Sequence, residues 1–394
     1  MSSLHSKKEN REIWYIGLLS FFGGVSQDVF GPILPIYLTS ILGFSNTLVG
    51  IAEGLVAASW NIFRVVSGYL SDRFKRQKPL IFVGYLLSMI SRPLLALVSS
   101  VVPVFTLRFM DGVGKGLKDP PKDVLIAGTS PEKRRGRSFG VSRMLDTFGS
   151  VAGPLLLALL LYLFRASTSV YHIILFVSAA PLLVTLIVLH QRVHEIPRVT
   201  VRTEMAAGKG TPLPTSFYLF LAVGVVFTLG NSSDAFLILR ARNLGVTLIE
   251  VPIVIALFNL IYALGAVPFG SLSDRIGRIP TLTIGWTAYT LTYVGFGLAG
   301  GAFVVWPLYI LYGLYYATSE GVARAYLADI VEFGHRGRAF GLYGMTIGLT
   351  TLPASVLAGF LWDRFGPRMP FFVGAALSGI AVLLLVLTRR FSRR

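Results

Sequence analysis

The sequence predicts an all-α membrane protein with twelve transmembrane helices arranged as two similar halves. Of its 394 residues, 54% are hydrophobic and only 14% are charged. Soluble domains are about 45–50% apolar and about 25% charged, so this composition argues against a water-soluble enzyme. Apolar stretches of the roughly 20 residues that a helix needs to cross a bilayer recur along the whole chain.

The apolar stretches follow one another with short connections. We expect transmembrane helices at residues 13–38, 46–70, 80–97, 101–124, 139–161, 171–190, 217–239, 249–272, 281–299, 303–327, 340–361 and 370–387. The first stretch is too long for a signal peptide and lacks a small-residue cleavage site.

One polar stretch, residues 191–214, is long enough to be a linker. It is rich in Arg, Thr, Gly and Pro, and it lies between the sixth and seventh expected helices. We therefore expect an N-terminal six-helix half over residues 1–190, a cytoplasmic linker over 191–214, and a C-terminal half over 215–394.

The positive charge of the chain carries an orientation signal. The net charge of +17 by itself is compatible with nucleic acid or anionic lipid as a partner. Most Lys and Arg residues outside the expected helices, however, lie in alternate connections, on the side of the membrane shared by both termini. Cytoplasmic loops are enriched in these residues. We expect a multi-pass protein of the cell membrane with cytoplasmic termini and no nucleic-acid partner.

Short motifs repeat at an offset of about 200 residues. Residues 68–76 return at 270–278, residues 26–30 at 232–236, and residues 135–140 at 336–341. Each motif occupies the same place in both halves. This pattern predicts a parallel repeat related by an axis along the membrane normal.

The first of these motifs resembles the signature of the major facilitator superfamily, G-x-L-[SA]-D-[RK]-x-G-[RK]-[RK], between helices 2 and 3. The matching residues are Gly68, Leu70, Ser71, Asp72, Arg73 and Arg76, and in the second copy Gly270, Asp274, Arg275, Gly277 and Arg278. The first copy has Lys75 where the signature has its second Gly.

Two further motifs strengthen the resemblance, which covers almost the whole chain. Arg108, Gly112 and Gly114 are similar to the R-x-x-x-G-x-G pattern of helix 4. In helix 5, the motif associated with antiporters is matched by Gly149, Gly153 and Pro154, without its trailing Gly pair. The run at residues 114–123, GKGLKDPPKD, resembles a poorly characterised prokaryotic branch of the superfamily.

The resemblance implies a transporter that works by alternating access, with helices 1, 4, 7 and 10 lining a central cavity. It also implies that the two Gly/Asp/Arg loops latch the outward-facing state on the cytoplasmic side. The expected partners are a small-molecule substrate, protons and the lipid bilayer. We expect a monomer without a cofactor, and the scattered histidines do not have the spacing of a metal site.

Ionisable residues inside the expected helices are the candidates for the mechanism, because each costs about 2.5–3.5 kcal/mol at the bilayer centre. They are Asp28, Glu53, Arg64, Arg92, Arg108, Asp111, Lys115, Asp146, Asp234, Glu320 and Arg324. So many charges imply a polar interior. We interpret Glu53, Arg64 and Arg92 as structural.

Asp28 and Asp234 lie at matching depths in helices 1 and 7. A carboxyl group in the cavity could bind and release a proton while the cavity changes the side to which it opens. The alternative is a carboxylate that is permanently paired with an arginine or that caps a broken helix.

Helices 4 and 10 provide a second candidate pair. Aligning Gly116 with Gly321 places Lys115 opposite Glu320, and it places Asp119 opposite Arg324. Opposite charges at matching positions could form an interdomain pair that breaks and reforms, since buried ion pairs often add little net stability. The alternatives are a static bridge, or attraction of an anionic substrate by Lys115.

Arg108 and Asp111 are three residues apart, so they can neutralise each other on one helix face.

The motif residues have a physical rationale. We expect Gly68 and Gly270 to allow close helix packing. Asp72 and Asp274 can meet the positive end of a helix from the other half, and the neighbouring arginines can supply the donors of a latch. Gly149, Gly153 and Pro154 would bend helix 5 and let a neighbour pack closely.

The sequence therefore predicts a secondary transporter, with proton coupling through Asp28, Asp234 or Glu320. Export is favoured on the helix 5 motif, and uptake or facilitated diffusion of a metabolite is the alternative. A membrane-embedded enzyme is disfavoured because no nucleophile motif is present. A channel is disfavoured because two fused halves with latch loops are not typical of a pore.

Overall fold

The structure is a computed structural model that describes residues 2–74, 76–130, 135–165, 168–195, 212–332 and 335–391. Within these ranges, side chains are described except at residues 2–10, 72, 135, 168 and 389–391. Lys75, most of the expected linker and the side chain of Asp72 therefore lie outside the described part.

The described chain is helical and contains no strand. Its elements are α1 (Ser2–Phe30), α2 (Leu34–Ile36), the π-helix η1 (Tyr37–Ile41), α3 (Asn46–Phe74), α4 (Lys78–Leu95), α5 (Val101–Thr129), α6 (Arg135–Leu163), α7 (Thr168–Val177), α8 (Ala180–Arg192), α9 (Thr215–Gly230), α10 (Ala235–Asn243), α11 (Glu250–Ile276), α12 (Arg278–Leu298), the short 3-10 helix η3 (Ala302–Val304), α13 (Val305–Ile330), α14 (Arg336–Phe365) and α15 (Met369–Phe391). All twelve expected segments are helical, which confirms the predicted fold class. In the described part, nine helical stretches are long and apolar enough to cross a membrane.

Three of the expected helices are interrupted rather than continuous. The first breaks between α1 and α2, the sixth between α7 and α8, and the seventh between α9 and α10. Pro35 and Pro181 lie in the first turn of α2 and α8, where a missing backbone N–H costs nothing. The polar run at residues 231–234 separates α9 from α10. These interruptions place Asp28 and Asp234 beside non-helical backbone.

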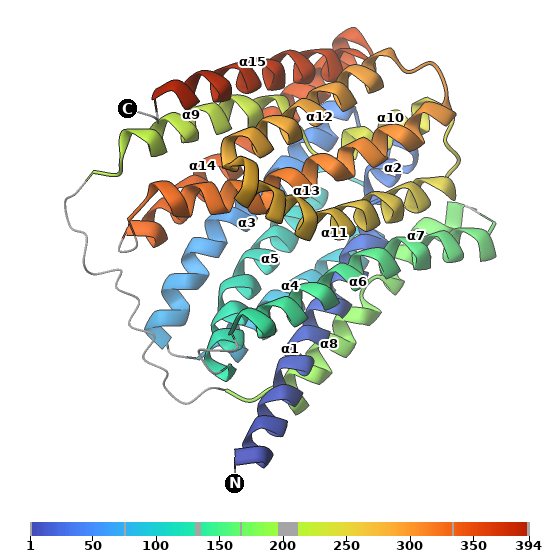
Figure 1. Ribbon diagram of the computed structural model, residues 1–394. Coiled ribbons are helices and arrows are strands. Elements are labelled where there is room, and N and C mark those ends of the chain that lie inside the picture. The colour runs from blue at the N-terminus through green and yellow to red at the C-terminus, as the bar shows by residue number, and fades with distance from the viewer. Residues whose placement is uncertain are drawn as a thin grey trace. The chain divides into compact units, whose positions relative to one another are not determined.

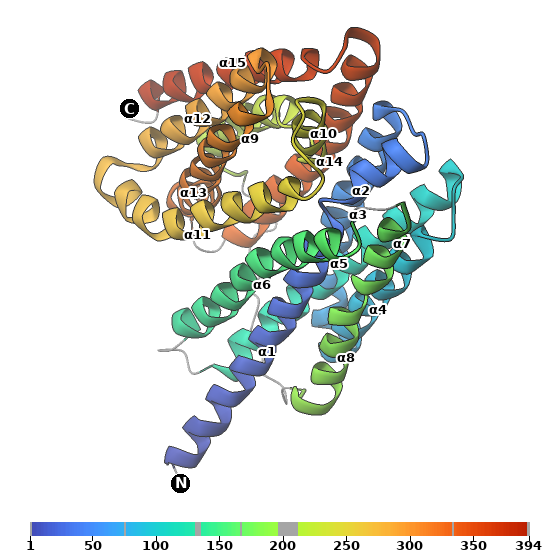
Figure 2. The same cartoon turned by 90° about the vertical axis from the view of Figure 1, so that its right-hand side faces the viewer.

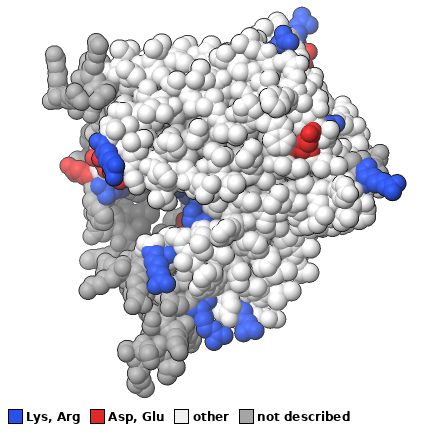
Figure 3. Space-filling model, turned by 45° about the vertical axis from the view of Figure 1, so that its right-hand side comes forward, with Lys and Arg blue, Asp and Glu red and all other residues white. Residues whose placement is uncertain are grey.

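The helices form two compact units. The first comprises residues 1–43 and 55–201, and the second comprises residues 44–54 and 202–394. In the first unit α1 packs against α6 and α8, and α4 packs against α5 and α8 (Figure 1). In the second unit α13 packs against α11 and α12, while α15 packs against α12 and α9 (Figure 2). On the face shown in Figure 3, most of the described surface is neither acidic nor basic, as lipid contact requires.

Glycines on two faces of α5 let its neighbours approach closely. A Cβ placed at Gly116 would lie 2.6 Å from the carbonyl oxygen of Trp60 in α3. A Cβ at Gly114 would lie 2.5 Å from the carbonyl oxygen of Gly84 in α4. Small residues allow such backbone contact in membrane proteins, where dispersion and hydrogen bonds hold helices together. The glycines thus bring the charged residues of α5 within reach of both neighbours.

The helix 5 motif packs α6 against α1. A Cβ at Gly153 would lie 2.8 Å from the carbonyl oxygen of Val25 and 2.9 Å from the Cβ of Asp28. The expectation for Gly68 and Gly270 stays a prediction, because no described atom lies within 4 Å of a Cβ placed at either position.

Asp363, near the end of α14, caps the N-terminus of α3 within the second unit. Its Oδ1 accepts from the Asn46 backbone N at 3.1 Å and from Asn46 Nδ2 at 2.8 Å. Its Oδ2 accepts from the Thr47 backbone N at 2.8 Å and from Thr47 Oγ1 at 2.6 Å. A carboxylate at the positive end of a helix is stabilising, so this residue fixes the first turn of α3 on α14.

We predict that Asp363→Ala lowers the stability of the purified protein by about 1–2 kcal/mol, because the first turn of α3 loses its acceptors. Thermal unfolding in detergent measures the change. Asp363→Asn keeps one accepting oxygen and should lose less. An unchanged midpoint for Asp363→Ala would show that the cap does not stabilise the fold.

Candidate functional site

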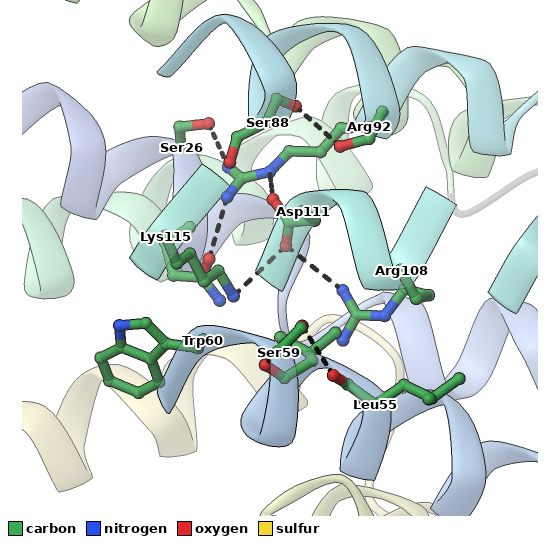
Figure 4. A network of polar contacts seen from close by, with 12 residues as sticks. Ser26, Leu55, Ser59, Trp60, Ser88, Arg92, Arg108, Asp111 and Lys115 are labelled. Atoms are coloured by element: carbon green, nitrogen blue, oxygen red, sulfur yellow. Dashed lines mark hydrogen bonds and ion pairs between the residues drawn. The ribbon is translucent and has the colours of Figure 1, made fainter. Parts of the chain in front are cut away.

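The centre of the first unit is a buried ionic cluster around Asp111 of α5 (Figure 4). Its Oδ1 lies 3.3 Å from Arg92 Nε. Its Oδ2 lies 3.3 Å from Lys115 Nζ and 3.5 Å from Arg108 Nη1. One carboxylate thus faces three cations, and it is fully buried. Such an arrangement is tolerated in a low-dielectric interior only when the charges stay together.

Arg92 connects three helices through this cluster. From α4, its Nη1 donates to Ser26 Oγ at 2.5 Å and its Nη2 donates to Gln27 Oε1 at 2.9 Å, both on α1. Its Nε donates to Asp111 on α5. Ser26 in turn donates to the carbonyl oxygen of Ser178, in the break between α7 and α8. Arg92 is therefore the principal residue that joins the elements of this site.

A buried aromatic ring lies against two of the cations. The guanidinium carbons of Arg92 and Arg108 are 5.0 Å and 5.5 Å from the ring centroid of Phe30. Both distances are within the range of cation–π attraction. Phe30 is fully buried at the end of α1, so it fills the apolar side of the cluster.

Asp28 lies on α1 beside this cluster but outside its ion pairs. It is half-buried and hydrogen-bonded to Ser150 of α6. In the described part, no Lys or Arg lies within ion-pair distance of its carboxylate, although the charges of Lys115 and Arg92 act on it from further away. The structure therefore does not pair Asp28 permanently with an arginine.

Asp234, the equivalent acid in the second unit, is held by tyrosines. Its Oδ1 accepts from Tyr312 Oη at 2.5 Å and its Oδ2 from Tyr316 Oη at 3.4 Å, both on α13. The residue occupies the N-cap position of α10, but its side chain makes no capping hydrogen bond. It is exposed, and in the described part it has no ion-pair partner. The nearby charge that acts on it is Glu53, another acid.

Glu320 belongs to the same face of the second unit. Its Oε2 accepts from Tyr262 Oη on α11 at 2.5 Å, and its Oε1 accepts from Arg324 Nη2 at 2.9 Å. Lys115 and Glu320 thus each have a charged partner one turn away on their own helix. The hypothesis that they exchange as an interdomain pair stays a prediction.

The packing of the two units corrects the alignment of helices 4 and 10. Gly112 approaches the carbonyl oxygen of Val56 in α3, and Gly313 approaches that of Phe258 in α11. These contacts make Gly112 and Gly313 equivalent. By contrast, Gly116 packs tightly against α3, whereas no described atom lies within 4 Å of a Cβ placed at Gly321.

The same correction follows from one hydrogen bond that both units make. Trp60 Nε1 donates to Asp119 Oδ2 at 2.9 Å, and Tyr262 Oη donates to Glu320 Oε2 at 2.5 Å. Glu320 is therefore the counterpart of Asp119, not of Lys115. The expected alignment was wrong because the flanking glycines, which are frequent in membrane helices, gave a false register.

In the corrected register, each charged residue of the first cluster corresponds to a tyrosine in the second unit. The pairs are Arg92 with Tyr293, Arg108 with Tyr309, Asp111 with Tyr312, and Lys115 with Tyr316. The hydrogen bonds agree, since Arg92 contacts Ser26 while Tyr293 contacts the equivalent Ser232, at 3.4 Å. One scaffold thus carries an ionic site in one half and a tyrosine site in the other.

In the second Gly/Asp/Arg loop, Arg278 has two acidic partners within its own unit. Arg278 Nη1 lies 2.6 Å from Asp274 Oδ1, and Arg278 Nε lies 3.0 Å from Asp329 Oδ2 on α13. Arg275 is exposed, as are Arg73 and Arg76 of the first motif. Asp72 falls on a side chain outside the described part.

Sequence reasoning listed Arg92 among the ionisable residues and interpreted it as structural, and the structure places it in the ionic cluster. The tyrosines around Asp234 were not selected at all. The run at residues 312–316, with three tyrosines one helical turn apart or adjacent, was the available signal.

Comparisons with known proteins agree with this architecture. A family model described as the Major Facilitator Superfamily matches residues 16–239 and 219–394. An uncharacterised MFS-type transporter of Methanocaldococcus jannaschii is 34% identical over 393 residues, which cover 97% of this chain and 96% of that protein. The multidrug resistance protein MdtH of Aeromonas hydrophila is 24% identical over 383 residues, covering 95% and 94%. A crystal structure of the nucleoside transporter NupG, as a D323A mutant, superposes with a TM-score of 0.77 at 15% identity, covering 95% and 99%.

We predict that Asp111→Ala destabilises the protein by about 3–5 kcal/mol, because three buried cations lose their shared carboxylate. Thermal unfolding and the yield of folded protein measure this loss. The matched control is Asp146→Ala, whose partner Arg143 is 57% exposed, and it should change stability by at most about 1 kcal/mol. Equal effects of the two variants would contradict a structural role for the ionic cluster.

Proposed function

The chain belongs to the Major Facilitator Superfamily, and we propose that it exports a small organic solute by proton-coupled alternating access. Membership makes it a multi-pass transporter of the cell membrane rather than an enzyme, with a small-molecule substrate. The coupling ion, the direction of transport and a monomeric state in the bilayer are parts of the proposal.

One observation carries the proton-coupling proposal. Asp234 of the second unit is an exposed carboxyl group, and its hydrogen-bond partners are the hydroxyls of Tyr312 and Tyr316. A tyrosine hydroxyl can either donate to a carboxylate or accept from a protonated carboxyl group. The surroundings of Asp234 therefore accommodate both protonation states. Asp111, by contrast, would lose its charge for three cations that share it if it were protonated.

The groups that surround each candidate acid differ in charge. Tyr312 and Tyr316 of α13 face Asp234, and Glu53 of α3 acts on it as a like charge. Asp28 is surrounded by Ser150 and Asp146 of α6, Lys115 of α5 and Arg92 of α4. We therefore assign the main coupling role to Asp234 and a secondary one to Asp28.

Glu320 is the third acid that the sequence proposes for coupling. Its Oε1 is paired with Arg324, so protonation would leave that arginine without its carboxylate partner. This pairing makes Glu320 a weaker candidate for coupling than Asp234.

Export is supported by two features of the chain. The helix 5 motif of Gly149, Gly153 and Pro154, similar to that of antiporters, packs directly on α1 next to Asp28. A relative that matches over almost the whole chain is named a multidrug resistance protein. Uptake or facilitated diffusion of a metabolite is the alternative within the family.

We predict that Asp234→Asn abolishes concentrative transport driven by a pH gradient, because the asparagine cannot exchange a proton. A thermal-stability screen of the purified protein against a library of small organic compounds first identifies a binder, since a ligand stabilises the state that it binds. Flux of that compound is then measured in proteoliposomes with and without an imposed gradient.

Exchange of labelled for unlabelled compound without a gradient should persist in Asp234→Asn if the carboxyl group serves only the coupling. Glu250→Gln, which removes an acid at the start of α11, should behave as the wild type. Full gradient-driven transport by Asp234→Asn would remove this residue from the coupling role. Flux that does not saturate and ignores the gradient would exclude a coupled carrier.

A further inference from the structure

We propose that the second unit binds an amphipathic organic cation, with the Asp234 carboxylate as its counter-ion and the rings of Phe258, Tyr262 and Tyr316 as its walls. This inference names the substrate class of the transporter and rests on the proposed function.

The first step is the charge of the face around Asp234. The carboxylate is exposed and has no Lys or Arg within ion-pair distance in the described part. Glu53 adds a like charge to its surroundings. Glu320 is paired with Arg324, which is itself 63% exposed. Asp234 therefore contributes a carboxylate that no Lys or Arg of the described part pairs with.

The second step is the continuous set of aromatic rings that joins the two carboxylates. The ring centroids of Tyr312 and Tyr316 are 5.3 Å apart, and Phe258 lies 5.3 Å from Tyr312 and 5.2 Å from Tyr316. Tyr262, which donates to Glu320, is 5.8 Å from Tyr316. Rings grouped next to a carboxylate are the recognised means of binding a quaternary ammonium or a similar cation.

The third step is the comparison with the first unit. There, the positions equivalent to Tyr293, Tyr309 and Tyr316 are Arg92, Arg108 and Lys115, and these cations surround an internal carboxylate. In the second unit the same positions provide ring faces and hydroxyls instead. The protein therefore supplies its own cations in one half, whereas in the other half a ligand can supply the cation.

The lining favours an organic cation over a metal ion. Calcium and magnesium need six or more oxygen ligands, and no group of three or more His, Asp or Glu residues that could hold a metal occurs in the described part. Ring faces attract a charge spread over an apolar body and bury that body at the same time. A protonated amine, quaternary ammonium or phosphonium compound with aromatic groups has this chemistry.

The test compares two probes of nearly the same shape and opposite charge, tetraphenylphosphonium and tetraphenylborate. Equilibrium binding of each labelled probe is measured on the purified full-length protein without any gradient. We expect saturable binding of tetraphenylphosphonium only. Asp234→Asn should weaken it at least about tenfold, which corresponds to about 1.4 kcal/mol.

Variants of Tyr316 separate the ring from the hydroxyl. Tyr316→Phe keeps the ring and should bind within about threefold of the wild type, whereas Tyr316→Ala should weaken binding about five- to tenfold. Glu250→Gln is the control for removal of an acid elsewhere in the unit. Thermal unfolding of each variant shows that it is folded, and the tyrosine series gives a result even if Asp234→Asn is unstable.

The inference is overturned if tetraphenylborate binds as tightly as tetraphenylphosphonium, if neither binds saturably, or if Asp234→Asn and Tyr316→Ala keep the wild-type affinity. Its failure is distinct from failure of the proposed function. Cation binding without gradient-driven flux would support the cation site and contradict the proton coupling. Gradient-driven flux of another compound without cation binding would support the coupling and contradict the cation site.

Discussion

The buried interaction of Arg92 with Asp111 is the constraint on which the first unit depends. Charges inside a membrane domain are stable only when they are partnered, and here one carboxylate is shared by three cations from two helices. The contact between Arg92 and Asp111 requires α5 to lie close to α4, and α5 is in backbone contact with both α3 and α4. Gly112, Gly114 and Gly116 make this possible. The glycines and the charged residues of α5 therefore act together, because close helix packing brings the ionic partners within contact distance.

The second unit repeats this helix packing, but with different side chains at the positions of the ionic cluster. Gly313 contacts α11 as Gly112 contacts α3, and Tyr262 donates to Glu320 as Trp60 donates to Asp119. The charged side chains, however, are replaced by tyrosines. Two equivalent acids, Asp28 and Asp234, consequently have different surroundings, with basic side chains near the first and hydroxyls, aromatic rings and a like charge around the second. The duplicated backbone thus supports a division of roles between the two halves.

Much of the fold could be predicted from the sequence, because the cost of exposing polar backbone to lipid allows only a few architectures. The twelve apolar stretches and the repeated motifs located every helix. The sequence did not reveal the interruptions beside Asp28 and Asp234, since Gly, Ser and Asn are compatible with both a continuous and a broken membrane helix. The alignment of Lys115 with Glu320 was also misjudged, because glycines at several positions of one helix allow more than one register. Only the packing of Gly112 and Gly313 on equivalent neighbours selects the correct one.

The sequence by itself determined that this protein is a membrane transporter of two repeated halves, and it identified the ionisable residues that the membrane makes costly. Hydropathy, the distribution of Lys and Arg, and the motif repeats depend on local composition, which is visible in one dimension. The tertiary structure decided which of those residues neutralise one another. Ion pairing depends on the faces that neighbouring helices present, so that Arg92 on α4 reaches Asp111 on α5, while the Asp234 carboxylate accepts from the hydroxyls of Tyr312 and Tyr316.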